Sequence, residues 1–247
     1  MCISWLSVSW VSAQSARDVA AQLDSLKPAI AAEVTAALTN ATHQTSYTTV
    51  WRDYEDGAID ALCEILPRHI PGLTATNFDR GKTGKEKNRL ADLAVICGTN
   101  LIEISIKAAR RSGNPENDLG TFREYPARKK IFTDSFTLWV RYTDDDGKII
   151  CDRAFFDRTW RFAGKASLVD GVKYRKKDGN MRPKPWAMFE SGAAYWQTEE
   201  EFEAAVKRSE AYRANELIKE YLGDLSDSDQ RLLYERLKEK FAAPAKP

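Results

Sequence analysis

Apolar and polar residues alternate within the run 101–107, strictly from Ile102 onward, which predicts a half-buried β-strand. Three isoleucines occupy one face of that strand, and the opposite face receives Glu103, Ser105 and Lys107. A second apolar run, 90–96, precedes it and contains Asp92, and Gly98-Thr99-Asn100 lies between the two runs. We expect the two runs to pair as an antiparallel hairpin.

The hydrophobic pattern also predicts the register of this hairpin. Leu93 and Val95 should share a face with the three isoleucines, because a slip of one residue would divide the apolar set between two faces. This register places Asp92 on the polar face beside Lys107, and it requires a two- or four-residue connection or a bulge. Two interpretations of the polar face remain: a divalent-cation site beside a phosphodiester, or a hairpin face that meets water.

Helical periodicity precedes the hairpin. Apolar residues recur at three- and four-residue steps over 17–39, with Pro28 inside the run, and over about 50–66, where Pro67 and a second proline close it. Glu55 borders the apolar stripe of the second helix. It either reaches inward or is a solvated glutamate on the flank of the helix.

The pattern after the hairpin predicts one helix at about 119–132 and two strands at 136–142 and 148–156, joined by an acidic Asp-Asp-Asp-Gly turn. The C-terminal tail reads as two helices, at about 198–222 and 228–241. The whole order predicts an α/β fold with a mixed central β-sheet flanked by helices and with helical N- and C-terminal extensions.

A length of 247 residues suits one large domain. Within it we distinguish an N-terminal arm and helix (1–46), a core with its loops (47–197) and a C-terminal helical extension (198–247). The mildly apolar residues 1–11 read as an arm that packs on the domain or on a second subunit.

Composition excludes several classes of site. The four cysteines form no CxxC pair, which argues against structural zinc and suits a reducing cytoplasm. Two histidines, His43 and His69, are too few for a site built on several histidines. No Gly-rich phosphate loop has the required spacing, and no run is long enough to span a membrane.

Charge directs attention to local patches. Lys and Arg number 37 against 36 Asp and Glu, so any nucleic-acid surface must be local. The glycine-punctuated basic segment 78–89 is either a loop that clasps a phosphate backbone or a solvated linker. The segment 173–186, with six cations and two aromatic residues, is either a loop that enters a DNA groove or a solvated hairpin.

The segment Ala91-Asp92 … Ile102-Glu103-Ile104-Ser105-Ile106-Lys107, with a helix carrying Glu55 upstream, resembles the PD-(D/E)XK nuclease superfamily, in particular type II restriction endonucleases. The resemblance covers roughly residues 47–156. It implies a restriction-endonuclease-like fold and a Mg²⁺ site in which Asp92 is the metal-binding aspartate, Lys107 the motif lysine and Glu55 the helix glutamate that many members add.

The sequence departs from the family two residues before Lys107. The family usually has Asp or Glu there, whereas this chain has Ser105, which is suited to holding a water molecule. Glu103 is the nearest acid that completes the metal shell, on the same face about 7 Å along the strand. Glu116 and Glu124 are the other candidates.

The resemblance further implies a cytoplasmic homodimer that cuts double-stranded DNA at specific sequences. Its alternatives are a nuclease of the same superfamily with another role (repair, or defence against methylated DNA), a non-catalytic DNA-binding protein and a protein-interaction domain. The residues expected to contact DNA are Arg110, Arg111, Lys173, Arg175, Lys176, Lys177, Asn180, Arg182 and Lys184.

Overall fold

The computed structural model describes residues 16–40, 50–77, 92–97, 100–145, 148–167, 169–223 and 225–242. The expectations for the N-terminal arm and for the basic loop 78–89 lie outside these residues.

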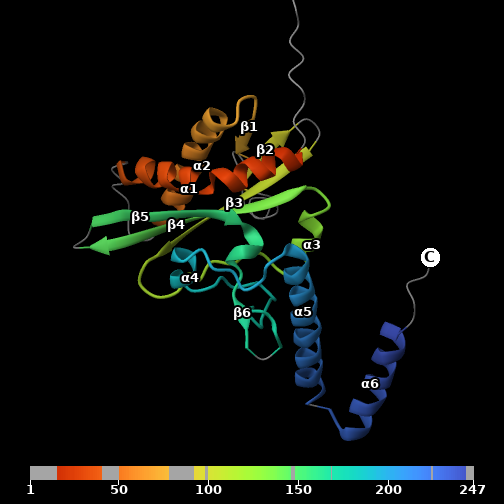
Figure 1. Ribbon diagram of the computed structural model, residues 1–247. Coiled ribbons are helices and arrows are strands. Elements are labelled where there is room, and N and C mark those ends of the chain that lie inside the picture. The colour runs from red at the N-terminus through yellow and green to blue at the C-terminus, as the bar shows by residue number, and fades with distance from the viewer. Residues whose placement is uncertain are drawn as a thin grey trace, which may run out of the picture.

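A mixed five-stranded sheet forms the centre of the protein (Figure 1). Its strands follow one another in chain order: β1 (Thr74–Asn77), β2 (Leu93–Cys97), β3 (Asn100–Arg110), β4 (Asp134–Asp145) and β5 (Lys148–Arg158). Only β3 and β4 run parallel, and the other neighbours are antiparallel. The predicted α/β class with a mixed sheet is therefore confirmed, although β1 was not predicted.

The β2–β3 hairpin has the predicted register. Leu93 pairs with Ile104 and Val95 pairs with Ile102. Cys97 pairs with Asn100, so the connection between the strands is two residues long, as one of the predicted alternatives requires. Asp92, one residue before β2, thereby lies on the polar face of β3.

Two long helices cover one face of the sheet, α1 (Ala16–Asn40) and α2 (Val50–His69) (Figure 1). Their apolar stripes pack with the isoleucines of β3 into one buried core. Pro28 lies inside α1 without ending it. α2 runs three residues past its predicted end at Leu66, because Ile70 N–H still donates to the Leu66 carbonyl oxygen beyond Pro67.

The opposite face is covered by an aromatic core. Trp139 of β4 and Phe155 of β5 pack edge-to-face against Phe189 of the short helix α4 (Trp186–Glu190). The same cluster includes the start of α5 (Glu199–Leu222) and the 3₁₀ helix η2 (Thr159–Phe162). α5 and α6 (Asp227–Ala242) extend away from the sheet, near the ends predicted from sequence (Figure 1).

The predicted helix at 119–132 is wrong in extent, since only α3 (Glu124–Arg128) is helical there. Gly120 has a φ of 98°, a conformation outside the helical region, so a regular helix cannot run through residue 120. Leu119 N–H donates to the Met181 carbonyl, and Met181 N–H donates to the Gly120 carbonyl. This segment is thus paired with the basic segment 173–182, and the tertiary pairing overrides the local helical pattern. Two further short strands, β6 (Lys165–Ala166) and β7 (Gly171–Val172), pair with each other. None of the helices described here has the length and apolar character needed to cross a bilayer.

Candidate active site

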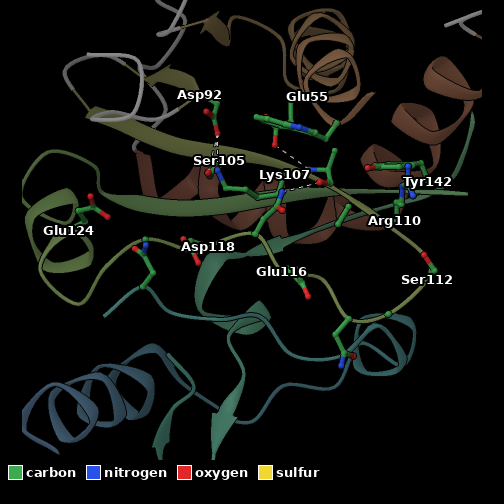
Figure 2. Close-up of a pocket in the computed structure, with 18 of the residues that line it drawn as sticks. Glu55, Asp92, Ser105, Lys107, Arg110, Ser112, Glu116, Asp118, Glu124 and Tyr142 are labelled. Carbon is green, nitrogen blue, oxygen red and sulfur yellow. Dashed lines mark hydrogen bonds and ion pairs between the residues drawn. The ribbon is translucent and has the colours of Figure 1, made fainter. Parts of the chain in front are cut away.

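The candidate site forms where β3 extends beyond its partner β2. β2 begins at Leu93, opposite Ile104, so the backbone N–H groups of Ile106 and Ala108 face an edge without a strand partner from β2. The Asp92 carboxylate oxygen Oδ2 accepts from Ile106 N–H at 2.6 Å, and Glu55 Oε1 of α2 accepts from Ala108 N–H at 3.3 Å. Two alternate donors of one strand therefore hold two carboxylates from different elements side by side (Figure 2).

Side chains of the polar face complete this arrangement. Ser105 Oγ donates to Asp92 Oδ2 at 3.0 Å, and Lys107 Nζ lies 3.8 Å from the same oxygen. Both hydrogen bonds that the described residues donate to Asp92 are accepted by Oδ2. The structure thus brings together four of the five residues predicted to be catalytic: Glu55, Asp92, Ser105 and Lys107.

These four residues line a cavity of about 820 Å³ (Figure 2). Its other walls include Glu116 and Asp118, on the segment that follows β3, and the aromatic rings of Trp51 and Tyr142. Among the described residues that line it, five are acidic and three are basic. With their carboxylates ionised, these residues carry net negative charge, which favours a cation over a bare phosphate.

Electrostatics single out Glu55 among these acids. Burial raises its pKa to about 7, the Lys107 ammonium opposes that rise, and the Asp92 carboxylate adds to it. A carboxyl whose pKa lies near neutrality, beside a second carboxylate and an amine in a cavity, is typical of functional sites.

The structure does not bring Glu103 into this cavity. Its side chain is 1% exposed and forms an ion pair of 2.6 Å with Arg128 NH1 of α3. Ser135 Oγ donates to its other oxygen at 2.9 Å. Burial raises the pKa of Glu103, and the Arg128 guanidinium opposes the rise. Both carboxylate oxygens are engaged away from Asp92, so the placement gives Glu103 no access to a metal ion beside Asp92.

The other two acids differ in role. Glu124 caps the N-terminal end of α3. Its carboxylate accepts from Thr121 N–H at 2.7 Å, and Thr121 Oγ1 accepts from Glu124 N–H. That reciprocal pair is a capping box and explains its position without a ligand. Glu116 is exposed and lines the cavity, but no hydrogen bond among the described residues holds its side chain near Asp92. Glu55 is therefore the acid best placed to act with Asp92.

The predicted basic segment is a folded hairpin rather than an open loop. Tyr174 and Met181 pair across it, and Arg213 of α5 donates to the carbonyl oxygens of Lys176 and Lys177. Arg175 donates to Asp178 at 2.9 Å, so this guanidinium is neutralised within the hairpin.

The remaining predicted DNA contacts fall into three groups. Arg110 and Asn180 line the cavity. Lys173 and Lys177 are exposed, as are Lys176, which is paired with Glu220, and Arg111, which lies 3.5 Å from Asp152. Arg182 lies 2.9 Å from Asp118.

Lys184 is placed differently from the prediction. It is 2% exposed, and its ammonium donates to the Ala193 carbonyl oxygen while facing the rings of Phe162 and Phe189. Burial lowers its pKa to about 8. Because its ammonium is enclosed by aromatic rings and a carbonyl oxygen, Lys184 is part of the aromatic core and does not reach a DNA surface.

Sequence analysis did not single out several cavity residues, among them Arg128, Asp118 and Trp51. Arg128 had a detectable signal, since a glutamate fixed by alternation inside a sheet needs a cationic partner. Trp51 had one too, since it lies four residues before Glu55 and therefore on the same face of α2. Asp118 had none, because the pairing of its segment with the basic segment brings it to the cavity.

Mg²⁺ fits the donor set at the edge of β3. No group of three or more His, Cys, Asp or Glu within the described ranges is arranged around a common point. Mg²⁺ does not need such a cage, because it retains several waters and is commonly bound by one or two carboxylates together with substrate phosphates. Asp92 and Glu55 would hold it.

No protein-family model and no curated protein matches the sequence. Among solved structures, the chain is similar to a NlaIV restriction endonuclease, with 13% sequence identity, coverage of 95% of this chain and 92% of that chain, and a TM-score of 0.44. That likeness is too distant to transfer residue roles from one chain to the other.

Proposed function

We propose that this protein is a Mg²⁺-dependent type II restriction endonuclease that hydrolyses phosphodiester bonds of double-stranded DNA at a specific sequence. One observation carries the proposal: Asp92, Lys107 and Glu55 converge on a single large cavity, with Asp92 fixed by both Ser105 and the backbone of Ile106. Asp92 and Lys107 match the aspartate and the lysine of the nuclease motif that the sequence resembles, whereas Ser105 stands where the motif usually has an acid.

The charge of the cavity supports a metal-dependent reaction. An acid-rich hollow repels a phosphodiester until a divalent cation neutralises it. Bound Mg²⁺ supplies that charge, orients the phosphate and makes a water more acidic. Asp92 and Glu55, held by the alternate N–H donors of Ile106 and Ala108 on the free strand edge, would determine where the ion binds.

The protein's own groups perform the remaining tasks. The Lys107 ammonium, with three donors close to Asp92, would orient the attacking water and stabilise negative charge that develops on the phosphate. Ser105 Oγ fixes the Asp92 carboxylate, so that the orientation of its second oxygen costs no reorganisation during the reaction. Glu55, with its pKa near 7, would be half ionised at neutral pH and largely ionised only above it, which favours metal binding at alkaline pH.

A twofold homodimer is the assembly that we propose for this activity. Each chain supplies one set of Asp92, Lys107 and Glu55, so cutting both strands of a duplex requires two chains, and a twofold pair matches a palindromic site.

The decisive experiment is digestion of a plasmid of known sequence with Mg²⁺, followed by sequencing of the ends. Wild type should cut at defined positions, and chelation by EDTA should stop it. Asp92→Asn and Lys107→Met should abolish cleavage yet retain DNA binding, whereas Lys207→Met, an exposed lysine of α5, should cut normally.

Cleavage by Asp92→Asn or Lys107→Met at the wild-type rate would refute the site. DNA binding by wild type without metal-dependent cutting would instead identify a non-catalytic DNA-binding protein of this fold, and absence of both would favour a protein-interaction domain. Methylated and unmethylated plasmids, compared in the same assay, distinguish a restriction enzyme from a nuclease directed at methylated DNA.

A further inference from the structure

The buried ion pair between Glu103 and Arg128 has one end inside the sheet and the other at the cavity. Glu103 is enclosed at the polar face of β3, two residues before Ser105. Arg128 lines the same cavity as Asp92 and Lys107, and its side chain is 22% exposed. The pair thus connects the sheet interior with the wall of the candidate active site.

Arg128 has donors to spare on the cavity side. A guanidinium carries five N–H donors in a planar fork. Within the described part of the chain, Arg128 uses one of them in a side-chain hydrogen bond, from NH1 to Glu103 Oε1 at 2.6 Å. An arginine held by one edge and open at the other is well suited to bind a phosphate, often with two parallel hydrogen bonds.

A series of hydroxyl groups fixes the anchor. Ser135 Oγ donates to Glu103 Oε2, Ser135 and Thr159 are hydrogen-bonded at 2.7 Å, and Thr159 and Thr137 at 2.9 Å. This network makes the orientation of Glu103, and through it that of Arg128, independent of substrate. A guanidinium that is already oriented loses less conformational entropy when it binds an anion.

The position of the Glu103–Arg128 pair relative to the motif residues indicates which phosphate Arg128 would bind. Glu103 and Ser105 are neighbours on one face of β3, a step of roughly 7 Å along the strand. The Arg128 guanidinium bonds Glu103, so it lies on the opposite side of Ser105 from Lys107. A DNA backbone whose scissile phosphate lies at Asp92 and Lys107 would present a flanking phosphate to Arg128.

We propose that Arg128 binds a phosphate that flanks the scissile one, and that Glu103 is the positioning residue that aims it. The inference rests on the proposed function for the location of the scissile phosphate. Glu103 is then a positioning residue and not the metal ligand expected from sequence, because its carboxylate forms an ion pair with Arg128.

The test uses the salt dependence of DNA binding, which reports phosphate contacts independently of cleavage. Arg128→Ala should lower the slope of log K against log salt concentration by about 0.9, the value for one phosphate contact on B-DNA. It should also weaken binding on the order of tenfold at fixed salt. Lys130→Ala, which removes an equal charge from an exposed position two residues later, is the matched control and should leave the slope unchanged.

Removing Arg128 alone leaves a buried carboxylate unpaired and risks unfolding. The double variant Glu103→Gln with Arg128→Met avoids this, because neither side chain is charged and both are similar in length to the originals. It should melt cooperatively and have the same reduced slope. Glu103→Gln alone keeps the cation but loosens its anchor, so it should raise KM for DNA more than it lowers kcat.

A neutral methylphosphonate, placed in turn at each phosphate around the cut, locates the contact. At one flanking position the substitution should weaken DNA binding by wild type. The Arg128→Ala variant should lose no further affinity at that position, which is the signature of a direct contact. An unchanged salt slope in folded Arg128 variants, or equal losses at every position, would overturn the inference. Binding with these signatures but without cutting would refute the proposed nuclease and leave the phosphate contact intact.

Discussion

Replacing Glu55 by glutamine should stabilise the metal-free protein, with a gain that begins near pH 4.5 and is complete above pH 7. The folded-state pKa of about 7 exceeds the ordinary value of 4.5 by roughly 2.5 units. At about 1.4 kcal/mol per unit, ionising Glu55 in the folded protein costs about 3 kcal/mol more than in the unfolded chain. Glutamine keeps an oxygen for Ala108 N–H but carries no charge.

The sign follows from proton binding. Below pH 4.5 the carboxyl is protonated in both states, so its contribution to stability is complete. Between pH 4.5 and 7 the unfolded chain releases the proton while the folded protein retains it, and stability declines as pH rises. Above pH 7 the full penalty applies. The advantage of Glu55→Gln should therefore grow from near zero at pH 4.5 to about 3 kcal/mol at pH 8, an upper value because water at the cavity mouth screens the charge.

Urea unfolding in EDTA at pH 5, 6, 7 and 8 measures this difference. Other groups with raised pKa values, such as Asp118 and Asp134, contribute equally to both proteins and cancel in the comparison. Glu64→Gln makes the same exchange at an exposed position of α2 and should show no pH-dependent gain. If the difference in the free energy of unfolding between Glu55→Gln and wild type stayed constant from pH 5 to 8, the raised pKa of Glu55 in the folded protein would be refuted.

Three other predictions concern the same site and its surroundings. Saturating Mg²⁺ should raise the melting temperature of wild type more at pH 8 than at pH 6, and the gain should disappear in Glu55→Gln. Ser105→Asp restores a carboxylate where the motif has one, so it should return measurable Mg²⁺-dependent cleavage to Glu55→Gln; no recovery, with Mg²⁺ binding restored, would show that Glu55 does more than hold the ion. Lys173→Ala with Lys177→Ala should lower the salt slope of DNA binding by about 1.8, whereas Lys207→Ala should leave it unchanged.

The hairpin was predictable because its information is local. Strict alternation over the six residues 102–107 determines which side chains share a face, and one register keeps the isoleucines together. Three of the motif residues, Asp92, Ser105 and Lys107, therefore followed from the sequence. The contribution of Glu55 was left open between two interpretations, because it depends on how α2 packs against β3.

Features that depend on distant pairing were not predictable. β1 is four residues of mixed polarity, and it is a strand because β2 offers it an edge. The helix expected at 119–132 was reduced to α3 by its pairing with the basic hairpin. Lys184 looked like a DNA contact among other cations, but the aromatic residues that enclose it come from segments more than four residues away in sequence.

The unequal lengths of β2 and β3 explain how the site exists at all. Had β2 begun further back, opposite Ala108, its carbonyl groups would have satisfied the N–H donors of Ile106 and Ala108, and both carboxylates would have been displaced from the edge. Backbone N–H donors inside a protein are almost always paired. The edge of β3 that β2 does not cover therefore requires acceptors from side chains, and Asp92 and Glu55 supply them. The requirement that stabilises the sheet edge thus also brings two negative charges together beside Lys107. The same hydrogen bonds that complete the sheet edge thus form the acidic site at which we propose that a divalent cation binds.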